Sequence, residues 1–323
     1  MTILVTGATG FIGRHLVEKL LECGSSVRVV TRDPDRLPSQ WRGRLEVVAG
    51  SLRDKGIQEA ATKGVGLVYH LAGEIRDPSS MRAINVEAVH GLLEVAALAG
   101  VKRVVHVSSV GVIGAVEPGV VTEETPCRPR TPYERTKLEG ERIVLEFAQS
   151  GGIEAMVLRP TIVFGDGVER NKDGFLEWLR AVQQERFVFI GKKSVANYVY
   201  VGDVVEAMVR VAESPVRGSA IYIVADPVPM REFVGAMAQA LGGTAPTRSL
   251  PVWAAYVLGA SLQAASRILG TPAPLTLSRV LALSSETLFS GEKLRTQAGI
   301  ALPFGYRKGL DLTVRWYRSA GRL

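Results

Sequence analysis

Three glycines spaced three residues apart, Gly7, Gly10 and Gly13, lie near the start of this chain of 323 residues. They follow the short apolar run Ile3-Leu4-Val5, which is typical of a buried parallel strand, and they precede an amphipathic helical pattern at residues 15–22. Glycine permits a tight strand-to-helix turn and lets the backbone approach a phosphate closely. Free N–H groups at the start of the helix attract the anion. The spacing therefore predicts a turn that binds the pyrophosphate of a dinucleotide.

Strand and helix patterns alternate regularly through the first half of the chain. Apolar, β-branched runs predict strands at residues 27–30, 45–48, 67–71, 104–107, 155–158 and 220–224. Helical patterns cover residues 81–99, 132–150, 175–184 and 203–212. This order predicts the α/β class, with a Rossmann-type doubly wound parallel sheet and a smaller, interleaved C-terminal substrate domain. We expect the dinucleotide-binding domain to comprise residues 1–165 plus 202–225, and the substrate domain residues 166–201 plus 226–323.

The net charge and the small numbers of cysteine and histidine residues restrict the classes of partner and metal site that we expect. The formal net charge is +7, but the basic residues are dispersed, which argues against nucleic-acid binding. Two cysteines are too few for a disulfide framework and no signal peptide precedes the first strand, so we expect a cytoplasmic protein. The four histidines lack metal-ligand spacing and predict no metal site. Of these, His70 and His106 follow β-rich runs and are expected to be buried and hydrogen-bonded.

Residues 251–269 form the most apolar stretch of the chain. Its uninterrupted apolar portion stops at Ser261, short of the roughly 20 residues that a membrane span requires. We therefore expect no transmembrane helix here, and a helix packed on the core is favoured over one lying on a membrane surface.

A tyrosine and a lysine stand four residues apart, at Tyr133 and Lys137, near the start of the helical pattern that follows the strand at 104–107. Residues at this spacing share a helix face, and a nearby cation lowers the pKa of a phenol, which makes it a usable acid or base. Ser109 follows the same strand and can donate a hydrogen bond to a substrate oxygen. The plainer alternatives are a decorative pair and a serine that satisfies turn backbone. The position of all three residues at the predicted crevice favours a catalytic role.

Further motifs occur in a fixed order along the chain, and with them the chain resembles the extended short-chain dehydrogenase/reductase family. That family includes NAD(P)-dependent epimerases, dehydratases, dihydroflavonol reductases and 3β-hydroxysteroid dehydrogenases. The resemblance is nearly end to end, and the tail from Pro251 to Tyr317 is most similar to the steroid-dehydrogenase and dihydroflavonol-reductase branch. The motifs that carry it are Thr6 to Gly13, Leu71-Ala72-Gly73, Asn85-Val86, Val107-Ser108-Ser109, Tyr133 to Lys137, Leu158-Arg159-Pro160 and Tyr200 to Val204.

The resemblance implies a role for each matching residue. Tyr133 would be the general acid/base, and Lys137 would lower its pKa and hold the nicotinamide ribose. Ser109 would orient the substrate oxygen, and Asn85 would support the central helix and a proton-relay water. Relatives often form homodimers through the helices that contain Asn85 and Tyr133, so a homodimer is expected. The expected cofactor contacts are Gly7, Gly10, Phe11, Ile12, Gly13, Arg32, Ser51, Leu52, Leu71, Ala72, Gly73, Tyr133, Lys137, Pro160, Ile162 and Val163.

The end of the second strand bears on the choice of cofactor. The acidic position of NAD-binding relatives falls on the neutral Thr31, and Arg32 follows it. An arginine here attracts the 2′-phosphate of NADP, so NADP is favoured over NAD, with Arg28 or Arg36 as possible helpers. Asp33 is ambiguous, because it can cap the following turn or reach the ribose. Ser51 replaces the aspartate that many relatives direct at the adenine.

Three function classes remain open. The first is a reductase or dehydrogenase acting on a medium-sized ketone or alcohol, steroid-like or flavonoid-like. The second is a nucleotide-sugar epimerase with tightly bound NAD, and the third a non-catalytic NADP-binding subunit. Residues 110–113 supply no acid or base for dehydration. Arg32 and the apolar tail favour the reductase, whereas residues 164–167 are common among sugar-nucleotide enzymes. A phosphate-bearing substrate would require basic residues, for which the candidates are Arg170, Arg180, Arg231 and Arg279.

Overall fold

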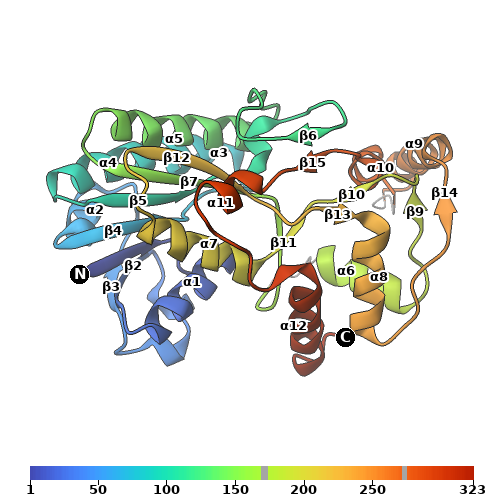
Figure 1. Cartoon of the computed structure of the whole chain (residues 1–323), viewed down its shortest axis with the longest axis horizontal. Coiled ribbons are helices and arrows are strands. Elements are labelled where there is room, and N and C mark those ends of the chain that lie inside the picture. Colours follow the sequence, from blue (N-terminus) through green and yellow to red (C-terminus); the bar gives the residue numbers. More distant parts are fainter. Residues whose placement is uncertain (169–173, 271–274) are drawn as a thin grey trace.

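A parallel β-sheet forms the half of the molecule that contains the N-terminus (Figure 1). The computed structural model describes residues 1–168, 174–270 and 275–323. Seven strands form the sheet in the order β12-β7-β5-β4-β1-β2-β3. The predicted doubly wound, Rossmann-type sheet is therefore confirmed. The strand bounds are β1 Thr2–Thr6, β2 Ser26–Thr31, β3 Glu46–Ala49, β4 Val65–His70, β5 Arg103–Val107, β7 Glu154–Pro160 and β12 Ser219–Val224.

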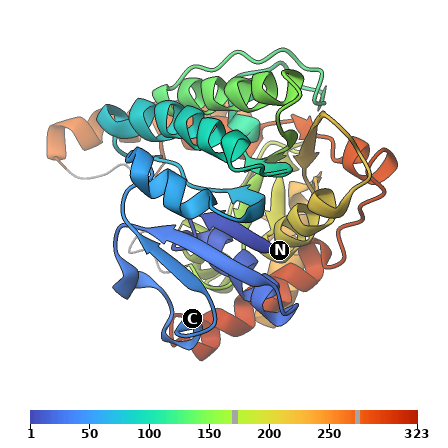
Figure 2. The same cartoon turned by 90° about the vertical axis from the view of Figure 1, so that its left-hand side faces the viewer.

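Helices cover both faces of the sheet (Figures 1 and 2). On one face α1 and α7 pack together, and α2, α4 and α5 cover the other. Ile3 and Val5 join the core on the α1 side, whereas Leu4 between them joins the core under α4. Burial on both faces explains why these strands are apolar throughout. The helix bounds are α1 Phe11–Glu22, α2 Lys55–Thr62, α3 Pro78–Arg82, α4 Ala88–Leu98, α5 Pro132–Gln149 and α7 Val201–Glu213.

The smaller lobe is built around an aromatic core. The rings of Tyr198 and Phe233 stack with their centroids 5.0 Å apart, and those of Phe164 and Phe175 do the same at 5.0 Å. These residues come from separate parts of the chain, so their packing fixes the lobe. Its elements are β8 Ile162–Phe164, α6 Gly174–Gln183, β9 Phe189–Ile190, β10 Val195–Ala196, β11 Tyr198–Tyr200, β13 Val228–Pro229, α8 Met230–Leu241, β14 Ser249–Leu250, α9 Val252–Leu269, α10 Leu277–Ser284 and α12 Gly305–Ser319.

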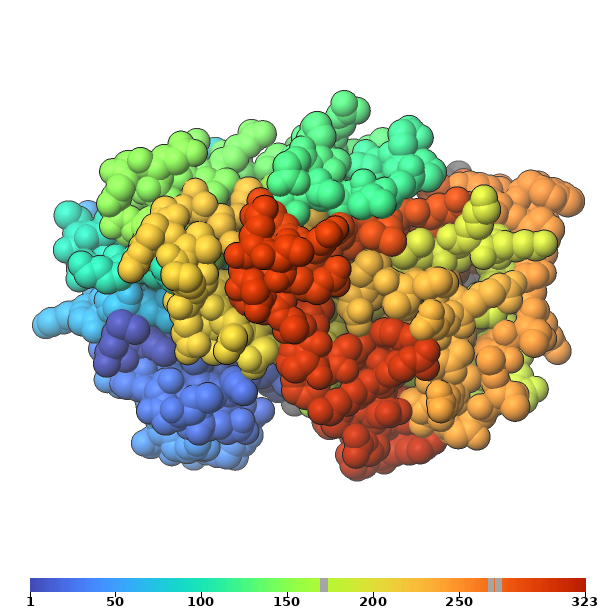
Figure 3. Space-filling view, in the orientation of Figure 1, coloured from blue at the N-terminus to red at the C-terminus, as the bar shows by residue number. Residues whose placement is uncertain are grey.

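The chain passes between the two lobes more often than predicted. Residues 201–224 return to the sheet lobe as α7 and β12. Leu294 and Ile300, which we expected in the substrate domain, pack instead in the core beneath α1 and α7. Figure 3 shows the red segment containing α11 (Glu292–Thr296) lying on the yellow residues of the sheet lobe, and α11 contacts β12. By its packing, the α11 region belongs with the sheet lobe.

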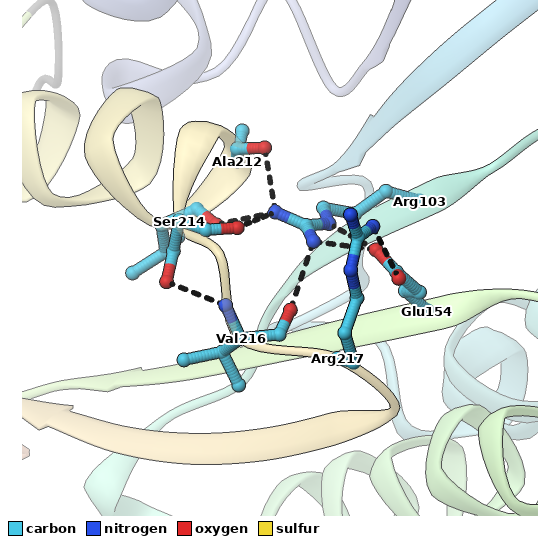
Figure 4. Close-up of polar contacts among 7 residues, drawn as sticks. Arg103, Glu154, Ala212, Ser214, Val216 and Arg217 are labelled. Atoms are coloured by element: carbon cyan, nitrogen blue, oxygen red, sulfur yellow. Dashed lines mark hydrogen bonds and ion pairs between the residues drawn. The ribbon is translucent and has the colours of Figure 1, made fainter. Parts of the chain in front are cut away.

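Arg103 ties the last strand of the sheet to the rest (Figure 4). Its guanidinium donates to Glu154 Oε2 at 2.5 Å from Nη2 and at 2.8 Å from Nε. The same group donates to the backbone carbonyls of Ala212, Ser214 and Val216 at 2.8, 2.6 and 2.9 Å. These carbonyls end α7 and lead into β12, where backbone acceptors would otherwise lack partners. One side chain of β5 therefore fixes the return of the chain to the sheet.

Helix α9 packs on the smaller lobe through a narrow stripe. Ala255 is buried, and a Cβ on Gly259 would lie 3.3 Å from Cγ2 of Val280 on α10. In contrast, the side chains of Trp253 and Val257 are 72% and 61% exposed. The expectation of a helix packed on the core thus holds for one side of α9 only. Within the described ranges, no helix combines the length and apolarity needed to cross a membrane.

Candidate active site

The glycine turn has the geometry that its spacing predicted. Gly7 adopts φ +74°, and a Cβ there would lie 2.7 Å from Ala72 N. A Cβ on Gly13 would lie 2.2 Å from Gly7 O, so only glycine at position 13 lets the start of α1 lie this close to the loop at Gly7. Helix α1 begins after Gly10, and no side chain caps it. Its first backbone N–H groups therefore remain available to a phosphate.

A cavity of about 630 Å³ runs along the carboxyl ends of β1, β2, β3 and β4. Phe11, Ile162 and Val163 line a second cavity instead, while Ile12, Gly13 and Pro160 line neither of these two cavities. The lining of the first cavity fits a dinucleotide, because the uncapped start of α1 at Gly10 and the basic end of β2 at Arg32 border the same space. The predicted cofactor contacts that line it are Gly7, Gly10, Arg32, Ser51, Leu52, Leu71, Ala72 and Gly73.

Asp33, just after the end of β2, caps the next turn and also lines the dinucleotide cavity. Its carboxylate accepts a hydrogen bond from Asp35 N at 3.1 Å and thereby caps the short helical turn Pro34–Arg36. Arg32 and Arg36 both line the dinucleotide cavity. Arg28, the other arginine that we considered for the 2′-phosphate, does not line this cavity. It pairs with Glu46 at 2.7 Å, at the far end of the strand.

Ser109, Tyr133 and Lys137 meet at the carboxyl end of β5. The Ser109 hydroxyl accepts from Gly111 N at 3.1 Å, which leaves its proton for another acceptor, and a hydrogen bond with Ser109 lowers the pKa of Tyr133. Burial has the larger effect and raises the Tyr133 pKa above its ordinary value. The net shift of the Tyr133 pKa is therefore upward, opposite to the lowering by Lys137 that we expected, because burial dominates it.

Lys137 is buried at the base of this group. Its ammonium donates to Val107 O at 2.8 Å, and burial lowers its pKa to about 8. Glu141, one helical turn further along α5, acts in the opposite direction and raises that pKa. Glu141 in turn forms a two-pronged ion pair with Arg159, at 2.5 and 3.1 Å. Neither member of this buried pair was predicted, although the spacing from Lys137 to Glu141 was a usable signal.

Asn85 connects the loop after β4, at Glu74, to α5, the helix that carries Tyr133 and Lys137. Its amide exchanges hydrogen bonds with the backbone of Glu74 at 2.8 and 2.9 Å, and donates to Thr136 Oγ1 at 3.0 Å. It lies in a π-helical turn, Ala83–Glu87, where we had predicted one continuous helix. A Cβ on Gly140 would lie 2.2 Å from Asn85 O, so α5 rests directly on this turn. Asn85 thus joins the backbone at Glu74 to α5 through Thr136.

The two histidines of the central strands are buried, but one expectation about them is wrong. Their rings stack 5.4 Å apart, and His70 Nδ1 shares a hydrogen bond with Thr6 Oγ1 at 2.8 Å. Within the described part of the chain, His70 Nε2 and both ring nitrogens of His106 have no partner. Burial and the nearby Lys137 lower both pKa values, that of His70 to about 3. Both rings therefore stay neutral near neutral pH. The expectation that both histidines are hydrogen-bonded holds for His70 Nδ1 and is wrong for His106.

The second cavity, of about 660 Å³, lies in the smaller lobe. Its walls are mostly apolar and aromatic, and include Phe11, Ile162, Phe175, Trp178 and Tyr198. The sheet order places β5 between β4, whose end borders the first cavity, and β7, whose end leads to the second. The end of β5, which Ser109 follows, thus lies between the ends of β4 and β7, and Ser109, Tyr133 and Lys137 line neither of these two cavities.

Only one candidate phosphate-binding arginine reaches this second cavity among those described. Arg279 lines it and pairs with Glu177 at 3.9 Å. Arg180 instead donates to Arg322 O at 2.8 Å, and Arg231 lies 4.5 Å above the ring of Phe189. Arg170 lies outside the described residues.

Comparison with known proteins identifies the family. Residues 3–225 match the model of the NAD dependent epimerase/dehydratase family, which covers most of the chain and all seven strands of the sheet except Thr2, the first residue of β1. The chain belongs to the NAD-dependent epimerase/dehydratase family. It is therefore an enzyme of the oxidoreductase type from a family that binds a nicotinamide dinucleotide, in agreement with the resemblance drawn from its motifs.

Similar members of the epimerase/dehydratase family differ in the reactions that their names describe. A "4-hydroxy-2-methyl-3-oxo-4-farnesyl-3,4-dihydroquinoline-1-oxide ketoreductase" from Stigmatella aurantiaca is 28% identical, over 96% of this chain and 95% of its own. A "3 beta-hydroxysteroid dehydrogenase/Delta 5-->4-isomerase" from Mycobacterium tuberculosis is 30% identical, over 98% and 90%. The solved structure of MoeE5 with UDP-glucuronic acid and NAD is 28% identical, with a TM-score of 0.75 over 99% of this chain and 100% of that one.

Proposed function

We propose that this enzyme interconverts a ketone and a secondary alcohol on a medium-sized apolar substrate, with NADP as its cofactor. The observation that carries the proposal is the aromatic cavity of about 660 Å³ in the smaller lobe, which reaches Ile162 and Val163 just after the end of β7. Such walls favour a largely apolar ligand, because burying apolar surface is the main source of binding energy there. The names of the Stigmatella and Mycobacterium relatives, a ketoreductase and a steroid dehydrogenase, support the same class.

The chemistry assigns one task to each residue of the site. When bound, the nicotinamide supplies or accepts the hydride. During reduction Tyr133 donates its phenolic proton to the substrate oxygen, and Ser109 donates a hydrogen bond to the same oxygen as it gains charge. Lys137, with a pKa of about 8, is mainly protonated at neutral pH and stabilises the phenolate that remains. Asn85 holds the helix in position through Thr136.

Cofactor preference is expected to depend on Arg32. Replacing Arg32 with serine should raise the Kd for NADPH by about 10- to 100-fold, which corresponds to one lost charge-assisted hydrogen bond, and leave the Kd for NADH nearly unchanged. Fluorescence titration of both cofactors measures this. Arg44→Ser is the control, because Arg44 is exposed and lies outside the lining of the cavity. Tighter binding of NADH than NADPH by the wild-type protein would contradict the proposed preference.

Interconversion of a nucleotide sugar is the second candidate function. It is supported by the likeness to MoeE5, whose solved structure contains UDP-glucuronic acid and NAD. The two candidates differ in what happens to the cofactor. A reductase consumes added NADPH in proportion to product, whereas an epimerase interconverts sugars with no net change in absorbance at the nicotinamide band. A panel of apolar ketones, steroids and nucleotide sugars, assayed with each cofactor, separates them, and sugar interconversion without cofactor turnover would overturn our proposal.

A further inference from the structure

We propose that the outer side of α9 and α10 is a docking surface for an anionic lipid bilayer. This α9–α10 face consists of six exposed apolar side chains, namely Val252, Trp253, Val257, Leu258, Leu277 and Leu281. Both helices lie at the end of the molecule opposite the sheet (Figure 1), and α9 projects past the outline of the sheet lobe (Figure 2). A concentration of large apolar groups of this kind on a surface marks an interaction site. The inference goes beyond the proposed function.

The exposed groups follow from how the two helices pack. Trp253 and Val257 are one helical turn apart on α9, and Leu277 and Leu281 are one turn apart on α10. The sides that carry Ala255 and Val280 are buried in a small shared core. The exposed rows therefore turn outward because the inward sides of both helices are already used. Tryptophan is also the side chain that most favours the interface between lipid and water.

The charges near this face select an anionic partner. No Asp or Glu occurs between Glu232 and Glu286 in the sequence, and none occurs between Glu185 and Asp203. The exposed Lys192, Lys193 and Arg248 adjoin the start of α9.

Backbone pairing fixes the place of these basic residues. Gly191 N donates to Leu250 O at 3.0 Å, and Phe189 N donates to Arg248 O at 3.0 Å, so the strand pair leads directly into α9. The acidic Glu177 pairs with Arg279 on α10 rather than opposing this basic group. The exposed Glu286 is the acid nearest to this group along the chain pairing, since Val195 N donates to Ser285 O at 2.9 Å, and three cations against it leave a net positive charge. Apolar groups flanked by a net positive charge match an anionic bilayer surface better than a neutral one.

The α9–α10 face also adjoins the second cavity. Ala282 and Leu283 of α10 line that cavity, as does Leu275 just before the helix. Leu277 and Leu281, on the same helix, are exposed. An apolar substrate dissolved in a bilayer would therefore reach the cavity across one helix, α10. This link to the substrate rests on the proposed function, whereas the contact with the membrane does not.

The test measures co-sedimentation of the full chain with vesicles. We expect binding to vesicles made of equal parts of phosphatidylcholine and phosphatidylglycerol, and about tenfold weaker binding to phosphatidylcholine alone. Val257→Asp should weaken binding to the anionic vesicles by about tenfold or more. The variant loses the valine that enters the bilayer and gains a negative charge, which the anionic lipid repels. Replacing Lys192 and Lys193 with serine should weaken it by about fivefold per residue. Leu98→Asp is the matched control, since Leu98 is 87% exposed on α4 in the other lobe, and it should bind like the wild type.

Three outcomes would overturn the inference. The first is that the wild type does not sediment with either vesicle, and the second is that Val257→Asp binds as well as Leu98→Asp. The third is that Val257→Asp converts a dimer into a monomer in analytical ultracentrifugation without lipid, which would make this face a contact between two copies of the chain. Cofactor turnover on a water-soluble ketone is measured separately, so failure of the membrane contact and failure of the proposed reaction remain distinguishable.

Discussion

Replacing Tyr133 with phenylalanine is expected to lower kcat by about 10²- to 10⁴-fold, the usual contribution of a positioned general acid or base. The reason is that Phe cannot exchange a proton with the substrate oxygen, whereas the ring still fills the space beside Ser109. The Kd for NADPH should stay within about twofold of the wild-type value, because one uncharged hydroxyl is removed near the cofactor. Steady-state kinetics with the best ketone of the panel and a cofactor titration measure the two quantities.

Tyr198→Phe provides the control for this change. Tyr198 lines the apolar cavity and loses the same hydroxyl, so its variant should keep kcat within about tenfold of wild type, as expected for a side chain that only contacts substrate. If Tyr133→Phe retained as much activity as Tyr198→Phe, Tyr133 would not be the acid or base. Loss of cofactor binding in Tyr133→Phe would instead indicate a structural role.

The second large effect concerns the buried ion pair under the site. Glu141 and Arg159 have side chains that are only 1% and 4% exposed. Glu141→Gln should lower the free energy of unfolding by about 3–5 kcal/mol, because it leaves the Arg159 charge buried without its partner. Urea unfolding at neutral pH, followed by circular dichroism, measures the loss.

A double replacement separates the pair from mere packing at this position. Glu141→Leu with Arg159→Met removes both charges, and we expect it to be more stable than Glu141→Gln by about 2 kcal/mol or more. Glu139→Gln on the same helix is the control, because the Glu139–Arg82 pair is exposed and should contribute less than about 1 kcal/mol. Equal losses in Glu141→Gln and Glu139→Gln would show that burial does not make the inner pair important.

The sequence was sufficient for features that local spacing determines. The turn at Gly7, the alternating elements and the grouping of Ser109, Tyr133 and Lys137 all follow from short-range patterns, and the structure agrees with each. These features depend on glycine conformation, on helix and strand periodicity, and on the rule that parallel strands present their carboxyl ends together. The roles of those residues in catalysis stay predictions.

Features that depend on long-range partners were not predictable. Whether Asp33 capped a turn depended on how the loop after β2 closed, and the engagement of Arg28 depended on Glu46 of the neighbouring strand β3. The exposure of one side of α9 was not predictable either, because an apolar helix has the same sequence pattern whether its second side is covered or exposed. The net effect on the Tyr133 pKa likewise depended on burial, which no local motif encodes.

The contacts of Arg103 have a consequence for how such enzymes can diversify. Because this side chain binds carbonyls that lie more than one hundred residues further along the chain, the sheet lobe is completed only after the chain has visited the smaller lobe. A fragment that ends at residue 165 would lack α7 and β12 and leave the guanidinium without those acceptors. A new substrate lobe therefore cannot be acquired as a module fused to one end. It has to be inherited as an insertion between β7 and β12 together with the segment that follows β12, so specificity in this architecture changes by remodelling these segments rather than by exchanging domains.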